Sequence, residues 1–267
     1  MPVDPSKPRK VLIVHGVQTG GSEDLNQDKL IAELIKSRLG PVPVSYECEL
    51  FRYEELNDKA VKMYQKLVGL LVANPVGQVV AKNVIDLAGD VVISLAPGGT
   101  ADIIRTGLRD KIMEIFAAGN PCYVVAHSLG SIYAFDVLNT LLAGDSLFER
   151  SSRKTWPIQG LLTIGSPIGL DMFKKTGRNV INDFGAGDKW FRWLNIWDPN
   201  DPVVSGSIFG EKLSAYKIAE DFLSGSPDQG WVVRDIVTDT GKSWLMAHTA
   251  YWQSSVVGDK LVDMITS

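Results

Sequence analysis

The sequence has few of the residues that build metal sites, disulfide frameworks or basic surfaces. Its 267 residues include only two cysteines, Cys48 and Cys122, and three histidines, and its net charge is −4. Neither cysteine has the spacing of a metal-ligand pair, and nothing requires a disulfide between them. A nucleic-acid partner would favour a basic face, which this composition does not offer. We therefore expect no metal and no nucleic acid.

A long apolar run is also missing. The longest weakly charged stretch, residues 67–97, falls short of the roughly 20 uninterrupted apolar residues of a membrane span. It is broken by one proline and three charged residues, Pro75, Lys82, Asp86 and Asp90. Because residues 1–10 contain no apolar signal segment, we expect a cytoplasmic protein. The lack of a transmembrane segment still leaves room for transient contact with a membrane surface.

What the chain does contain is the alternation of an α/β protein. Hydrophobic residues make up 45% and charged residues 22% of the sequence, which argues against disorder. Short apolar runs alternate with helical patterns, so we expect one domain over 1–267 with a mostly parallel sheet covered on both faces. The predicted strands are 10–15, 42–51, 122–126, 159–164, 193–197 and 231–237. Helices are predicted from Asp24 or Asn26 to Leu39, from Thr100 or Asp102 to Ala118, over 129–142 and over 249–265, and residues 57–95 are predicted to be helical in two pieces.

One serine lies where a strand turns into a helix. Ser128 stands in Ala126-His127-Ser128-Leu129-Gly130, between a buried apolar run and the predicted helix 129–142. A catalytic serine needs an exposed position and a neighbouring base, and a sharp turn flanked by small residues provides the first. The alternative is an ordinary serine at the start of a helix. We take Ser128 as the candidate nucleophile.

The base and the acid are sought further along the chain. His127 adjoins Ser128, but neighbouring residues at such a turn point in different directions, so we expect a buried supporting role for it. His248 is then the histidine available as general base, on a loop before the last helix. A carboxylate must orient that histidine. Asp201 is our first choice and Asp198 the second; either also suits an ordinary turn before proline.

These segments resemble those of the α/β-hydrolase serine esterases and lipases. The likeness lies in residues 126–138, in Asp201-Pro202-Val203, and in His248 with Tyr251 three places on. It implies the α/β-hydrolase fold, with Ser128 as nucleophile, Asp201 as acid and His248 as base, in the chain order of that family. It spans most of the chain from Val11 to Tyr251, but only the segment around Ser128 is specific.

Two backbone groups are candidates for the oxyanion hole. The N–H of Leu129 opens the helix after Ser128 and points toward charge that develops there. The resemblance implies a second donor on the loop after an early strand, and we expect the N–H of Val17, with Gly16 allowing close approach. His15 would organise this loop by hydrogen bonding; the alternative is an ordinary histidine at a strand end.

The expected reaction is the hydrolysis of a carboxylic ester or lipid through an acyl-enzyme, without a cofactor. A thioesterase or acyltransferase would use the same residues, and a non-catalytic binding protein of this fold is the rival from another class. Residues 57–97 form either a helical cap over an acyl site or ordinary packing helices. Trp190, Trp193 and Trp197 line an apolar pocket or belong to the core.

Overall fold

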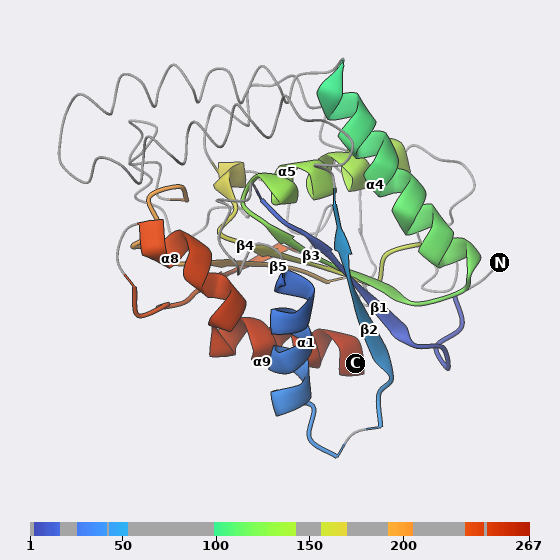
Figure 1. The fold of residues 1–267 in the computed structure, drawn as a ribbon, viewed down its shortest axis with the longest axis horizontal. Coiled ribbons are helices and arrows are strands. Elements are labelled where there is room, and N and C mark those ends of the chain that lie inside the picture. Colours follow the sequence, from blue (N-terminus) through green and yellow to red (C-terminus); the bar gives the residue numbers. More distant parts are fainter. Residues whose placement is uncertain are drawn as a thin grey trace.

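The fold is that of an α/β protein with one parallel sheet between two layers of helices (Figure 1). The computed structural model describes residues 3–16, 26–41, 43–52, 99–142, 156–169, 192–204, 233–242 and 245–267. The predicted fold class is confirmed, because every strand pairing in these ranges is parallel. The predicted cap, 57–97, lies outside the described residues, as does Val17.

The sheet has six strands in the order β2-β1-β3-β4-β5-β6. Their bounds are β1 Arg9–Val14, β2 Tyr46–Phe51, β3 Cys122–His127, β4 Gly160–Ile164, β5 Arg192–Trp197 and β6 Val233–Val237. All residues of β3 and β4 are buried. Both strands are mostly apolar because helices cover both faces of the sheet. Since all six run the same way, their carboxyl ends meet at one edge of the sheet.

Helices α1 (Gln27–Arg38) and α9 (Ser255–Thr266) cover one face, and α4 (Thr100–Ala117) and α5 (Leu129–Asp136) cover the other (Figure 1). On the first face, Ile31 and Ile35 of α1 pack with Leu261 and Ile265 of α9 in a buried apolar cluster. On the second, the ring of Phe135 lies 5.5 Å from that of Trp193. The described helices include none long and apolar enough to cross a bilayer.

Several element boundaries differ from the sequence predictions. The predicted helix 129–142 is α-helical only as far as Asp136 and continues as a π-helix over Val137–Leu142. His248 lies within a short helix, α8 (Leu245–Thr249), where a loop was expected. A 3-10 turn, η5 (Ala250–Gln253), separates α8 from α9. Both cysteines are free thiols.

Candidate active site

The backbone at Ser128 adopts a conformation that side chains other than glycine rarely take. Its φ is 52° and its ψ is −130°, and it is the one non-glycine residue with positive φ among those described. Its N–H donates to the carbonyl of Ile164 on β4 over 3.1 Å. Such strain costs about 1–3 kcal/mol and persists only where the surroundings enforce it. The sharp turn between β3 and α5 therefore holds Ser128 at the carboxyl edge of the sheet.

Two glycines allow the chain to pack closely around this turn. A Cβ at Gly16, just after β1, would lie 2.5 Å from the Cβ of Ser128. A Cβ at Gly130 would lie 2.5 Å from the carbonyl oxygen of Val14. Neither distance is compatible with ordinary van der Waals contact, so side chains at these positions would push β1 away from α5. Close packing around the turn therefore requires glycine at positions 16 and 130.

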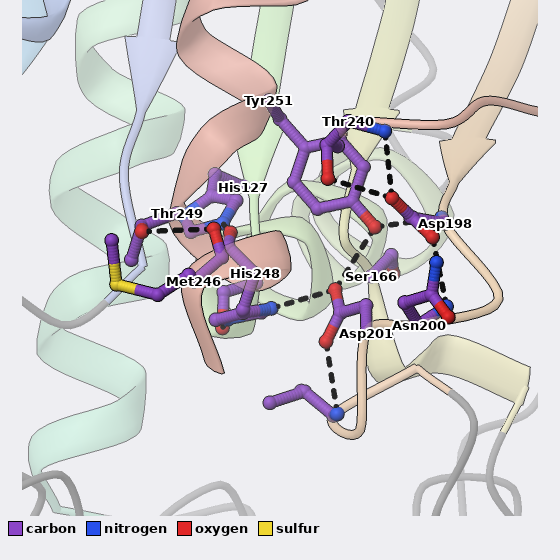
Figure 2. A network of polar contacts seen from close by, with 12 residues as sticks. His127, Ser166, Asp198, Asn200, Asp201, Thr240, Met246, His248, Thr249 and Tyr251 are labelled. Atoms are coloured by element: carbon purple, nitrogen blue, oxygen red, sulfur yellow. Dashed lines mark hydrogen bonds and ion pairs between the residues drawn. The ribbon is translucent and has the colours of Figure 1, made fainter. Parts of the chain in front are cut away.

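A chain of hydrogen bonds joins three of the predicted residues. The Nε2 of His248 lies 2.9 Å from the Oγ of Ser128, and its Nδ1 lies 2.8 Å from the Oδ2 of Asp201. A carboxylate only accepts, so Nδ1 carries the hydrogen and Nε2 presents its lone pair to the serine hydroxyl. All three residues are buried, and Ser128 is only 2% exposed, so the exposed position expected for the nucleophile is wrong for this structure. Figure 2 shows the contact between His248 and Asp201. The three side chains come from the ends of β3 and β5 and from α8.

The two candidate acids occupy different environments (Figure 2). Asp201 presents Oδ2 to His248, while its Oδ1 accepts the N–H of Val203 over 2.9 Å. Asp198 directs its carboxylate away from the histidine. Its oxygens accept hydrogen bonds from the N–H of Asn200 and from the N–H and hydroxyl of Thr240, at 2.7 to 2.8 Å. Asp198 therefore fixes the loop after β5, and Asp201 faces the imidazole.

His127 is buried beside His248. Its Nε2–H donates to the backbone carbonyl of His248 over 2.8 Å, and the two ring centroids are 4.7 Å apart. Burial, and the neighbouring His248, lower the pKa of His127 well below its ordinary value of 6.5. The ring is consequently neutral at physiological pH. It holds the backbone of α8 by donating a hydrogen bond and adds no charge next to the imidazole.

Tyr251 contacts both aspartates of the loop after β5. Its hydroxyl donates to the Oδ2 of Asp201 over 2.9 Å and accepts the N–H of Asp198 over 2.8 Å. The side chain is fully buried, and this burial, followed by the charge of Asp201, raises the pKa of Tyr251 well above 10.0. Sequence reasoning noted Tyr251 only as part of the resemblance. Its spacing from His248 was the available signal, but its contact with the loop was not foreseeable.

A pair of buried hydroxyls behind Ser128 was missed as well. Ser131 Oγ donates to the carbonyl of Ser128 over 2.5 Å and lies 2.6 Å from the Oγ of Ser166. Because the hydrogen of Ser131 is used on Ser128, Ser166 donates to Ser131. Ser166 in turn accepts the N–H of Ile168. These bonds connect the segment after β4 to the turn, and serines at a helix start give no sequence signal for them.

His15 and Leu129 lie at the same edge. His15 is buried at the end of β1, and its Nδ1 donates to the carbonyl of Gly16. Leu129 is the first residue of α5, beside Ser128. Trp193 belongs to the core, since it is fully buried and its indole N–H donates to Thr163 over 2.9 Å. In the described ranges, no group of three metal-ligating side chains comes together.

Comparison with known proteins gives a distant structural likeness. No family model matches the sequence, and no curated protein matches it. Among solved structures, a crystal structure of esterase PE8 matches with a TM-score of 0.45 and 12% sequence identity. The match covers 100% of this chain and 95% of the PE8 chain. So weak a likeness transfers neither fold nor activity.

Proposed function

We propose that this chain is a serine hydrolase of the α/β-hydrolase type that cleaves carboxylic esters. The observation that carries the proposal is the hydrogen-bond chain from Ser128 through His248 to Asp201, at 2.9 and 2.8 Å. The strained backbone of Ser128 at the junction of β3 and α5 supports it. Three side chains that lie far apart in sequence meet in the arrangement that nucleophilic acyl transfer requires.

The proposed reaction has two halves. In the first, Ser128 Oγ attacks the ester carbonyl carbon while His248 Nε2 takes the hydroxyl proton, and the imidazolium then protonates the departing alkoxide. The product is an acyl-enzyme and a free alcohol. In the second, His248 takes a proton from water as the water attacks the acyl carbon. The proton returns to Ser128 as the carboxylic acid leaves, and Asp201 stabilises the imidazolium in both halves.

The negative charge of each tetrahedral intermediate needs donors on the far side of the attacked carbon. The N–H of Leu129, at the start of α5, supports a site there because a helix N-terminus favours negative charge. Gly16 packs directly against Ser128, so the loop after β1 approaches the same point. We assign the second donor to Val17 on that loop, as the resemblance implies.

Reaction with a fluorophosphonate probe tests the nucleophile directly. We expect the probe to label the folded protein on Ser128, and the Ser128→Ala variant to take no label. Ser37→Ala is the matched control, because it removes an exposed hydroxyl of α1 far from the site, and it should label like the wild type. Wild-type protein that stays unlabelled while folded would refute the proposal in favour of a binding protein of this fold.

Substrate assays then test the ester class. Hydrolysis of p-nitrophenyl esters of increasing chain length measures how far an acyl site extends, and parallel assays with acyl thioesters separate an esterase from a thioesterase. We expect turnover of the oxygen esters, with the same loss in Ser128→Ala.

A further inference from the structure

The hydroxyl of Tyr251 is bound from both sides by the loop that carries the proposed acid. It donates to Asp201 Oδ2, the same oxygen that accepts His248 Nδ1–H, and it accepts the N–H of Asp198. We propose that Tyr251 is a positioning residue that acts through Asp201 and sets how strongly this carboxylate binds the imidazolium of His248. This inference rests on the proposed function and adds to it a residue outside the Ser-His-Asp set.

The hydrogen bonds that Asp201 accepts explain why the Tyr251 hydroxyl would affect the reaction. Asp201 has two donors on Oδ2, from Tyr251 and His248, and one on Oδ1, from the N–H of Val203. The phenol stays protonated because burial raises its pKa, so it competes with the imidazolium for the negative charge of one oxygen. A donor that shares the oxygen weakens the pull of the carboxylate on the proton of His248.

The position of Tyr251 in the chain also supports a role in geometry. Tyr251 lies on η5, three residues after His248, so one short segment carries both donors to Asp201. The Asp198 N–H fixes the phenol oxygen, and Asp198 is itself tied to Thr240 beyond β6. The distance between His248 and Asp201 is therefore set by two contacts with Asp201, both made by the segment that comprises α8 and η5.

Other titratable groups face this site and must be kept constant in a test. His127 contacts His248, with its ring 6.1 Å from that of Tyr251, and His15 acts electrostatically on His127. Asp198 faces the phenol through its backbone. None of these side chains loses a described hydrogen bond to the Tyr251 oxygen when that oxygen is removed, so Tyr251→Phe acts on Asp201 and on the Asp198 N–H alone.

The test compares Tyr251→Phe with the wild type across the pH range. The readouts are the rate of fluorophosphonate labelling of Ser128 and kcat/KM for a p-nitrophenyl ester. We expect kcat/KM to fall about tenfold to a hundredfold, because Asp201 loses a contact that positions it against His248. We also expect the acidic limb of both profiles to move to higher pH, since a carboxylate relieved of one donor holds the imidazolium more tightly.

The matched control is Tyr46→Phe, which removes a hydroxyl that donates to the carbonyl of Ala32 at the β2 edge of the sheet. Its labelling and its pH profile should equal those of the wild type. In the Asp201→Asn background, Tyr251→Phe should change the rate little, because the carboxylate through which it acts is gone.

A second variant should shift the acidic limb of the pH profiles in the opposite direction. Protein with 3-fluorotyrosine at position 251 keeps the hydroxyl but makes it a stronger donor, so the acidic limb should move to lower pH. Unchanged limbs in both variants, with Ser128 still labelled in the wild type, would overturn the role of Tyr251 and leave the hydrolase proposal intact. Absence of labelling in the wild type would overturn both.

Discussion

At the scale of single residues, the two aspartates of the loop after β5 show how position decides chemistry. Both are fully buried and both accept several hydrogen bonds. The partners of Asp198 are loop groups, and Asp201 alone of the two faces an imidazole. Buried carboxylates three residues apart can thus have separate tasks: Asp198 holds the backbone, and Asp201, under the proposed function, orients His248.

Exchanging each carboxylate for an amide separates these tasks. Asp201→Asn should lower kcat by about a thousandfold or more, because the amide favours the wrong tautomer of His248. Asp198→Asn should lower the free energy of unfolding by about 1–3 kcal/mol, since it disturbs the bonds to Thr240. Ester hydrolysis and urea unfolding measured on both variants check this. A larger loss of turnover in Asp198→Asn would reverse the assignment.

Much of the candidate site could be predicted at this scale because histidine is scarce. With His127 set aside by its position next to Ser128, His248 followed by elimination, and the structure places it within reach of Ser128. The sequence favoured Asp201 over Asp198 but could not settle the choice, since it depends on contacts with Thr240 and Tyr251 from distant segments. The hydroxyls of Ser131 and Ser166 were unpredictable for the same reason. The roles of these residues stay proposals.

At the scale of elements, a buried ion pair joins the two helices on one face of the sheet. Arg105 of α4 donates through Nε and Nη2 to Oδ2 of Asp136, the last residue of α5, at 2.8 to 2.9 Å. The same guanidinium reaches Asp102 over 2.9 Å, but the Asp102 side chain is 53% exposed, against 4% for Asp136. The buried contact holds α5, which begins next to Ser128, against α4.

Removing each carboxylate in turn tests that difference. Asp136→Ala should lower the free energy of unfolding by about 3 kcal/mol, because it leaves a buried guanidinium short of its main partner. Asp102→Ala, the matched control on the same arginine, should cost less than about 1 kcal/mol, since water screens the exposed pair. Urea unfolding of the two variants measures both. Equal losses would show that burial of the pair does not matter.

The elements themselves were largely predictable, because buried strands and amphipathic helices leave clear patterns. The strand cores of β1, β3, β4 and β5 fall where short apolar runs predicted them. The π-helix after Asp136 and the short helix α8 were not foreseen. The apolar spacing of these two segments is the same as that of their neighbours. Their helix type therefore depends on the residues that pack against them. Ile103 of α4 is apolar yet 49% exposed, because the apolar spacing of a helix does not show how much of its surface is covered.

At the scale of the whole molecule, buried histidine couples stability to pH. Burial, and the neighbouring His248, keep His127 neutral in the folded protein by lowering its pKa well below 6.5, whereas the unfolded chain binds a proton near that value. Below pH 6.5 the unfolded state therefore binds more protons than the folded state. The stabilisation is complete above pH 6.5 and is lost as the pH falls toward the folded-state pKa.

The expected result is a free energy of unfolding that declines on acidification, with His127 contributing up to about 1.4 kcal/mol per pH unit. His127→Asn removes this titration and keeps an amide donor for the carbonyl of His248. The variant should be less stable than the wild type at pH 8, yet lose stability less steeply between pH 6.5 and 5. Urea unfolding at several pH values measures both slopes, and parallel slopes would contradict the prediction.

The positive φ of Ser128 has a consequence for how such a chain evolves. A glycine would adopt that backbone without steric cost, so the fold would gain stability at the moment it lost the hydroxyl. Under the proposed function, selection for turnover and selection for stability therefore oppose each other at position 128. In a lineage that no longer needs the reaction, position 128 is where we expect relaxation to begin.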